Sequence, residues 1–148
     1  MDNIDDILDF AIRREEESYD FYMKMADKTQ FSGLKEVFKE FAQEEAGHKK
    51  KLLEIKAGAK DIPELGQITD LKISDYSVPM KASDDMSYQD TLILAMNREK
   101  AAYRLYNDLA ARTTDSTAHN LFLVLAQEEA KHKLRFEVEY DENVLKEN

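Results

Sequence analysis

The sequence predicts an all-α protein of four long helices, arranged as two antiparallel helical hairpins that are joined by a long crossover. Three observations predict this fold class. Glycine (4) and proline (2) are scarce among 148 residues while 35% are charged, a composition typical of long helices with solvated outer faces. Apolar residues recur at spacings of three and four, the helical period. The chain also contains an internal repeat, and each copy is long enough for two helices.

The repeat aligns the two halves of the chain without a gap, at an offset of 84 residues. An Ala-x-x-Arg-Glu segment at 11–15 matches 95–99, and Ala-Gln-Glu-Glu-Ala-x-His-Lys at 42–49 matches 126–133. Residues between the copies match neither half. We therefore predict one domain over residues 1–148, with hairpins over 3–57 and 87–146 and a crossover over 58–86.

Within each hairpin we expect two helices of about 25 residues. The first runs over 4–28, the second over 32–57, the third over 87–112, and the fourth from residue 116. Ser87 is a candidate N-cap, with Asp90 three residues later in a capping-box position, and Gly58 is a candidate helix stop. The short links inside each hairpin force antiparallel pairs. The predicted buried stripes include Ile7, Leu8, Ala11, Ile12, Tyr19, Tyr22, Phe38, Ala42, Leu52, Leu92, Ala95, Ala102, Tyr103, Tyr106, Phe122, Leu125, Ala126 and Phe136.

Six side chains that can bind metal fall on these apolar stripes. Glu15 lies four residues after Ala11 and four before Tyr19, so it points into the bundle with them. The second helix of each hairpin carries Glu-x-x-His, which places a carboxylate and an imidazole side by side on one face. The six inward-facing residues are Glu15, Glu45, His48, Glu99, Glu129 and His132.

Buried carboxylates need a counter-charge, because burying an ionised carboxylate without one costs on the order of several kcal/mol. No inward-facing Lys or Arg stands out in the sequence to supply it. Four glutamates, two neutral histidines and two divalent cations sum to zero charge. We therefore predict that the six residues bind two metal ions.

The donor set favours particular metals and roles. Oxygen-rich ligands with one nitrogen for each metal suit iron or manganese, whereas zinc more often takes more nitrogen or sulfur; two irons are predicted, with manganese or zinc as alternatives. Glu45 and Glu129 share helices with the histidines and are the predicted bridges. Tyr22 and Tyr106, two turns beyond Glu15 and Glu99, are candidates to hydrogen-bond the ligating carboxylates, although core packing explains them equally well.

Composition excludes several other classes. A net charge of −10 and a pI near 4.8 argue against nucleic acid and against an anionic membrane surface as partners. The absence of cysteine excludes disulfides and iron–sulfur clusters. The N-terminus is acidic, whereas a signal peptide begins with basic residues that are followed by an apolar stretch. A cytoplasmic location is therefore the default expectation.

A glutamate followed some thirty residues later by Glu-x-x-His, repeated across a long connector, resembles the di-iron carboxylate ferritin-like family. The local pattern Ala-x-x-x-Glu-x-x-x-Tyr-x-x-Tyr is most similar to rubrerythrin and its single-domain relatives. This resemblance implies a ferritin-like four-helix bundle, two irons, a reaction with peroxide or dioxygen, and a homodimer.

Two departures from the rubrerythrin pattern bear on function. The chain lacks cysteine and so has no rubredoxin domain, which means that electrons must come from an external donor, such as a rubredoxin-like protein. Rubrerythrins carry an extra Glu three residues after the first ligand of the second half, and Ala102 stands there. Three functions therefore remain open: a peroxide- or dioxygen-reducing oxidoreductase, an iron-handling ferroxidase, and a metal-stabilised structural module.

Overall fold

The computed structural model describes residues 3–29, 32–58, 71–78 and 86–143. Its elements are α1 (Ile4–Lys28), α2 (Ser32–Gly58), the short 3-10 helix η2 (Ile73–Tyr76), α4 (Tyr88–Ala111) and α5 (Ser116–Asn143). The described ranges contain no strand, as the all-α prediction requires. The chain divides between Ile73 and Ser74 into two compact units, each of which holds one helical hairpin.

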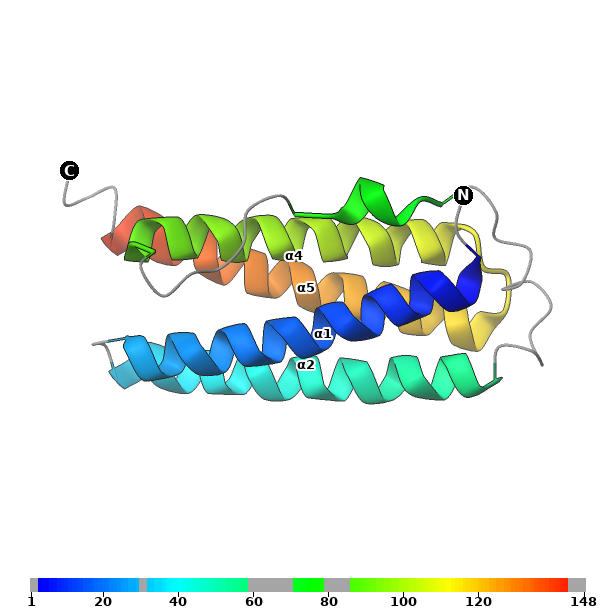
Figure 1. Cartoon of the computed structure of the whole chain (residues 1–148), viewed down its shortest axis with the longest axis horizontal. Coiled ribbons are helices and arrows are strands. Elements are labelled where there is room, and N and C mark those ends of the chain that lie inside the picture. Colours follow the sequence, from blue (N-terminus) through cyan, green and yellow to red (C-terminus); the bar gives the residue numbers. More distant parts are fainter. Residues whose placement is uncertain (1–2, 30–31, 59–70, 79–85, 144–148) are drawn as a thin grey trace. The chain divides into compact units, whose positions relative to one another are not determined.

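The first unit is the antiparallel pair of α1 and α2 (Figure 1). Asn3 begins α1 as its N-cap, since its side-chain oxygen accepts a hydrogen bond of 2.8 Å from the backbone N–H of Asp6. The acidic first turn of α1 suits the positive end of the helix dipole. At the same end of the hairpin, Lys56 near the end of α2 pairs with Asp9 of α1 at 2.5 Å. The cap thus defines where α1 begins, and the ion pair joins α1 to α2 at this end of the hairpin.

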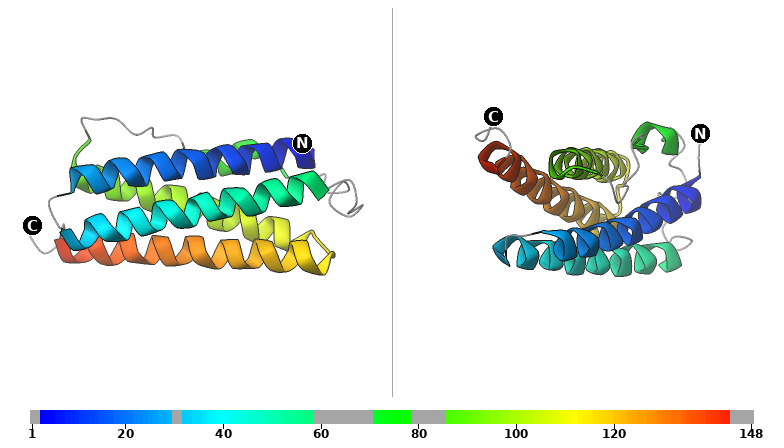
Figure 2. Two further views of the ribbon diagram at one scale, coloured as in Figure 1. Left: turned by 90° about the horizontal axis from the view of Figure 1, so that it is seen from below. Right: turned by 60° about the vertical axis from the view of Figure 1, so that its left-hand side comes forward.

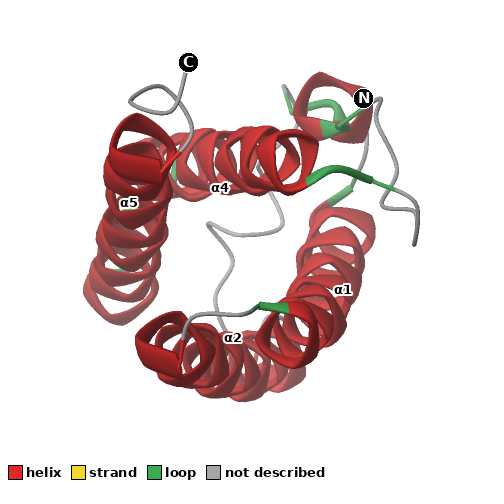
Figure 3. Ribbon diagram, turned by 90° about the vertical axis from the view of Figure 1, so that its left-hand side faces the viewer, coloured by secondary structure: helices red, strands yellow, loops and turns green. Residues whose placement is uncertain are grey.

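The second unit is the antiparallel pair of α4 and α5, and these two helices lie side by side in every view (Figures 2 and 3). Ser87 caps α4 and accepts a bond of 3.0 Å from the N–H of Asp90, so the predicted N-cap is confirmed. The Asp115 carboxylate accepts from the N–H of Ala118 at 2.9 Å and begins α5. The His119 ring lies 2.7 Å from the Ala110 carbonyl oxygen and ties the start of α5 to the end of α4.

Part of the connector between the hairpins is also described. Tyr76 of η2 is buried, and its hydroxyl donates to an oxygen of Asp108 on α4 at 2.6 Å. The rest of the predicted crossover, residues 59–70 and 79–85, lies outside the described residues. None of the described helices combines the length and the apolar character that crossing a membrane requires.

The buried stripe predicted for the third helix is wrong at one residue on its edge. Tyr103 was expected to be buried on the inner face of the third helix, but 41% of it is exposed. It lies next to the true inner positions Ala102 and Tyr106, both fully buried. A buried stripe on a helix is about 100° wide, and adjacent residues are about 100° apart, so the period alone does not decide which neighbour is covered.

Candidate metal centre

The first unit brings Glu15, Glu45 and His48 together, and we call these three residues the first half-site. α1 supplies Glu15, and α2 supplies the Glu-x-x-His pair. Both carboxylates are 0% exposed. The Nδ1 atom of His48 lies 3.6 Å from an oxygen of Glu15 and 3.3 Å from an oxygen of Glu45. One donor atom from each residue falls within 4.8 Å of the others.

The second unit repeats this arrangement with Glu99, Glu129 and His132, the second half-site. α4 supplies Glu99 and α5 supplies the other two. All three are buried, and the Nδ1 atom of His132 lies 3.6 Å from an oxygen of Glu99. Their donor atoms likewise lie within 4.8 Å of one another. Each hairpin thus unites the three donors that the repeat predicted for it.

Arg14 lies against the first half-site, and the sequence did not predict this contact. The expectation that no Lys or Arg faces inward was wrong, because Arg14 is only 7% exposed and its Nη1 lies 3.5 Å from Glu15 and 3.9 Å from Glu45. The signal was present, since Arg98 holds the matched position in the second half. A long arginine beside a ligand can curl its guanidinium inward although its Cα sits at the edge of the apolar stripe.

These contacts control the ionisation of Glu15. Burial by itself raises the pKa of this carboxyl, but the interactions with His48 and with the positive charge of Arg14 outweigh burial, so the pKa lies below its ordinary value. Glu15 is therefore an ionised carboxylate, the form that binds a cation.

The donors fit a metal ion of the first transition row. Two ligands that are each about 2.1 Å from one metal and at right angles are roughly 3 Å apart, close to the measured separations between Nδ1 and carboxylate oxygens. The same separations are long for strong hydrogen bonds. Carboxylates and imidazole are the ligands that iron, manganese and zinc accept, so each half-site has the chemistry to hold such an ion.

The remaining predicted site residues have mixed outcomes. Tyr22 and Tyr106 are 1% and 0% exposed, and Tyr22 packs against the ring of Phe41 with centroids 6.0 Å apart. Their predicted hydrogen bonds to the ligands stay a prediction. Ala102 is fully buried, and its methyl group offers no ligand atom at that position.

A surface cavity lies beside the first half-site on the first hairpin. A cavity of about 430 Å³ is lined by Glu15 together with Glu16, Tyr19, Asp20, Gln43, Ala46 and Lys49. Glu16 forms an ion pair with Lys49 at 3.0 Å. We call this cavity the acidic groove, because carboxylates dominate its charged residues. A negative groove raises the local concentration of cations.

Comparison with solved structures identifies the class of fold. The chain is similar to a ferritin-like diiron-carboxylate protein from Thermotoga maritima, with 22% identity, a TM-score of 0.82 and 96% of each chain covered. It is also similar to a hypothetical protein from Pyrococcus furiosus, with 22% identity, a TM-score of 0.71, and 93% of this chain and 88% of that one covered. The fold is therefore the ferritin-like four-helix bundle.

The family is equally clear. Residues 6–140 match the family described as Rubrerythrin, so the chain belongs to the rubrerythrin family. No curated protein matches it. The predicted family and fold class are confirmed, and the buried glutamates and histidines mark the protein as a candidate metal binder.

Proposed function

We propose that the protein is a di-iron carboxylate oxidoreductase that reduces peroxide or dioxygen with electrons from an external donor. The observation that carries this proposal is the presence of one buried Glu, Glu-x-x-His half-site in each hairpin of a rubrerythrin-family chain. In the proposed centre the residues of both half-sites would together hold two iron ions. Glu45 and Glu129 would bridge the ions, and the protein would act as a homodimer.

The bound irons would supply the electrons and the Lewis acidity for cleaving an O–O bond. The chain's own residues prepare the site. Burial of the half-sites excludes bulk water and strengthens their electrostatic interactions. Arg14 supports the ionised state of Glu15 from 3.5 Å away. The buried hydroxyl groups of Tyr22 and Tyr106 are proposed to orient the ligating carboxylates.

An iron-handling ferroxidase is the second candidate. Ala102 stands where rubrerythrins have a carboxylate near the second half-site, and the acidic groove, which Glu15 helps to line, would attract ferrous ions. The first feature departs from the pattern of the peroxide-reducing rubrerythrins, and the second suits the uptake of iron.

The first experiment measures iron content and peroxide reduction on iron-loaded protein. We expect about two irons per chain, and continuous reduction of peroxide when a reduced rubredoxin is supplied as the donor. Glu45→Gln together with Glu129→Gln should lower the iron content and abolish turnover, because an amide is a far weaker ligand than a carboxylate.

Matched controls come from the neighbouring repeated glutamates. Glu44→Gln with Glu128→Gln makes the same change of charge one residue away and should keep both irons. Full iron content in the Glu45 and Glu129 double variant would refute the ligand assignment. Iron-to-chain ratios far above two, without sustained peroxide turnover, would favour iron handling over the oxidoreductase.

A further inference from the structure

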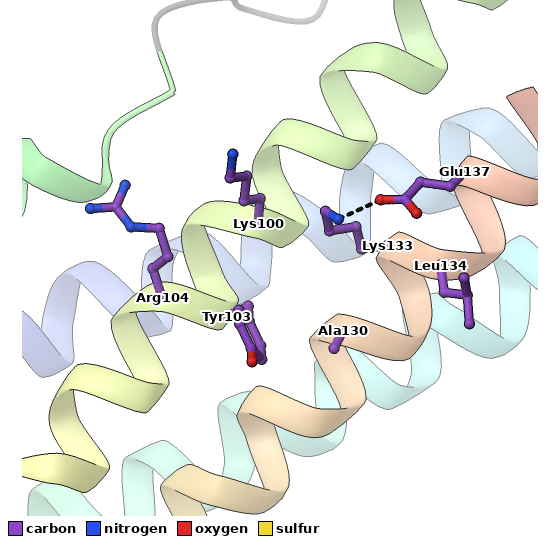
Figure 4. A pocket seen from close by; sticks show the side chains of 7 residues that line it. All are labelled: Lys100, Tyr103, Arg104, Ala130, Lys133, Leu134 and Glu137. Atoms are coloured by element: carbon purple, nitrogen blue, oxygen red, sulfur yellow. Dashed lines mark hydrogen bonds and ion pairs between the residues drawn. The ribbon is translucent and has the colours of Figure 1, made fainter.

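The second hairpin has a surface groove that the metal centre does not use. It has a volume of about 410 Å³ and lies between α4 and α5 (Figure 4). We call it the basic groove, because its charged residues are three cations and one carboxylate. Its lining consists of Lys100, Tyr103, Arg104, Ala130, Lys133, Leu134 and Glu137.

The basic groove occupies the position in the second hairpin that the acidic groove occupies in the first. At the offset of 84 residues, Tyr19, Ala46 and Lys49 of the acidic groove match Tyr103, Ala130 and Lys133. The tyrosine, the alanine and the lysine are thus common to both grooves. Both grooves therefore have the same local backbone and the same small and aromatic side chains in their lining. The fold does not determine the charge of either groove.

The charge of the groove is reversed at two matched positions. Glu16 is replaced by Lys100, and Asp20 is replaced by Arg104. In the acidic groove the shared lysine is neutralised by Glu16. In the basic groove the matched partner is itself a lysine, and Lys133 pairs instead with Glu137, one turn further along α5. A protein with a net charge of −10 therefore concentrates cations in one concave place.

Contacts outside the groove hold one of its cations. The guanidinium carbon of Arg104 lies 5.8 Å from the centre of the Tyr76 ring, within range of a cation–π interaction. The Tyr76 hydroxyl is in turn bound to Asp108 at 2.6 Å. Arg104 is thus positioned by η2 rather than left to sample many rotamers, which reduces the entropy lost when it binds an anion.

The groove also has an apolar side. Tyr103 is 41% exposed and Leu134 is 59% exposed. Figure 4 shows Tyr103 on the side of α4 toward Ala130, and Leu134 on α5 next to Lys133. A concave volume of a few hundred Å³ with apolar walls and a few charged groups along it is typical of a small-molecule site. Arginine and lysine together favour carboxylate, sulfonate or phosphate groups.

We propose that the basic groove binds a small organic anion, with its acidic group held by Lys100 and Arg104 and its apolar part against Tyr103 and Leu134. The test uses anilinonaphthalene sulfonate, an aromatic anion whose fluorescence rises on binding, with iron-loaded protein. Inorganic phosphate is then added as a competitor for the acidic group. We expect one equivalent of probe per chain, displaced by phosphate.

Three variants make the test specific. Lys100→Glu with Arg104→Asp gives the basic groove the charges that the acidic groove has at the matched positions. This variant should weaken probe binding by about tenfold or more. Lys24→Glu with Lys51→Glu makes the same change of net charge at exposed positions of α1 and α2 and should alter affinity less than about twofold. Glu16→Lys with Asp20→Arg makes the acidic groove basic and should add a second equivalent of bound probe.

Circular dichroism establishes that each variant is folded, and iron content is a second control for the two variants that leave the acidic groove unchanged. Equal probe affinity in the folded Lys100 and Arg104 variant would overturn the proposal. So would equal losses in that variant and in the Lys24 and Lys51 variant, because binding would then follow net charge. Failure of the probe to bind, together with conversion of a dimer to a monomer by Lys100→Glu and Arg104→Asp, would show that the groove is a subunit interface and would also overturn it.

Discussion

Arg14 changes the charge balance of the metal centre. Its guanidinium lies within 4 Å of two buried carboxylates, so the first half-site carries a built-in partial counter-charge. A bound metal is then the second source of positive charge. The folded chain can therefore keep Glu15 ionised without a bound metal.

We expect Arg14→Gln to destabilise the metal-free protein by about 1–3 kcal/mol, because two buried carboxylates lose a cation. The loss should be smaller in the iron-loaded protein, where the metal supplies the charge. Urea unfolding of both forms measures this difference. Arg13→Gln is the matched control, since Arg13 is exposed and should change stability little in either form. Equal losses for Arg14→Gln with and without iron would contradict this account.

Two tyrosines give the second unit a dependence on alkaline pH. Burial and a hydrogen bond to a carboxylate raise the pKa of Tyr76 and of Tyr88, whose hydroxyls donate to Asp108 and Glu139. The pKa of a tyrosine in the unfolded chain is about 10. A higher pKa in the folded state therefore contributes stability that is complete below about pH 10 and is lost as the pH rises above that value, because the unfolded chain then releases its phenol protons first.

The stability advantage of the wild type over Tyr76→Phe with Tyr88→Phe should therefore be greatest at neutral pH and should shrink above about pH 10. Thermal melts followed by circular dichroism at several pH values would measure it. An advantage that stays constant from pH 8 to pH 11 would mean that these phenols do not ionise differently in the folded and unfolded states.

At the scale of the helices, the sequence was most informative where local chemistry decides the outcome. Asn3 and Ser87, 84 residues apart, both accept from the N–H three residues later, and helix boundaries agree with the prediction to within about one residue. The three donors of each half-site follow from the same periodicity. The helical period does not show how far a long side chain reaches, so it did not predict that Arg14 turns inward. It also does not show how wide the buried stripe is, so it did not predict that Tyr103 is exposed.

Helix α2 contains a glycine whose replacement should raise the stability of the protein. Gly47 is exposed in the helix interior, and a Cβ added there would meet nothing within 4 Å. The matched position of α5 carries Lys131, so the shared scaffold accepts a side chain. Gly47→Ala should stabilise the protein by about 0.5–1 kcal/mol, because alanine loses less backbone entropy in a helix.

Differential scanning calorimetry should show the melting temperature rising by roughly 2–4 °C. Gly33→Ala, which is equally open but close to the start of α2, should give a smaller rise because helix ends fray. A fall in melting temperature for Gly47→Ala would mean that the glycine has a packing or functional role.

For the whole molecule, metal binding and stability should be linked. A metal that binds only the folded state stabilises it in proportion to the logarithm of its concentration over the dissociation constant. Chelator-treated protein should thus melt at a lower temperature than iron-loaded protein. Glu45→Gln with Glu129→Gln should reduce this gap, and calorimetry of the four samples measures it. An unchanged gap in the double variant would show that these carboxylates are not ligands.

The pairing of helices also bears on how the chain acquires its structure. Each described hairpin joins helices that are consecutive in sequence, α1 with α2 and α4 with α5, so many of its contacts span short stretches of chain. Such local topologies fold quickly, because little loop entropy is lost before contacts form. On the ribosome the first hairpin is complete while the second is still being synthesised. Glu15, Glu45 and His48 can therefore assemble before their counterparts exist.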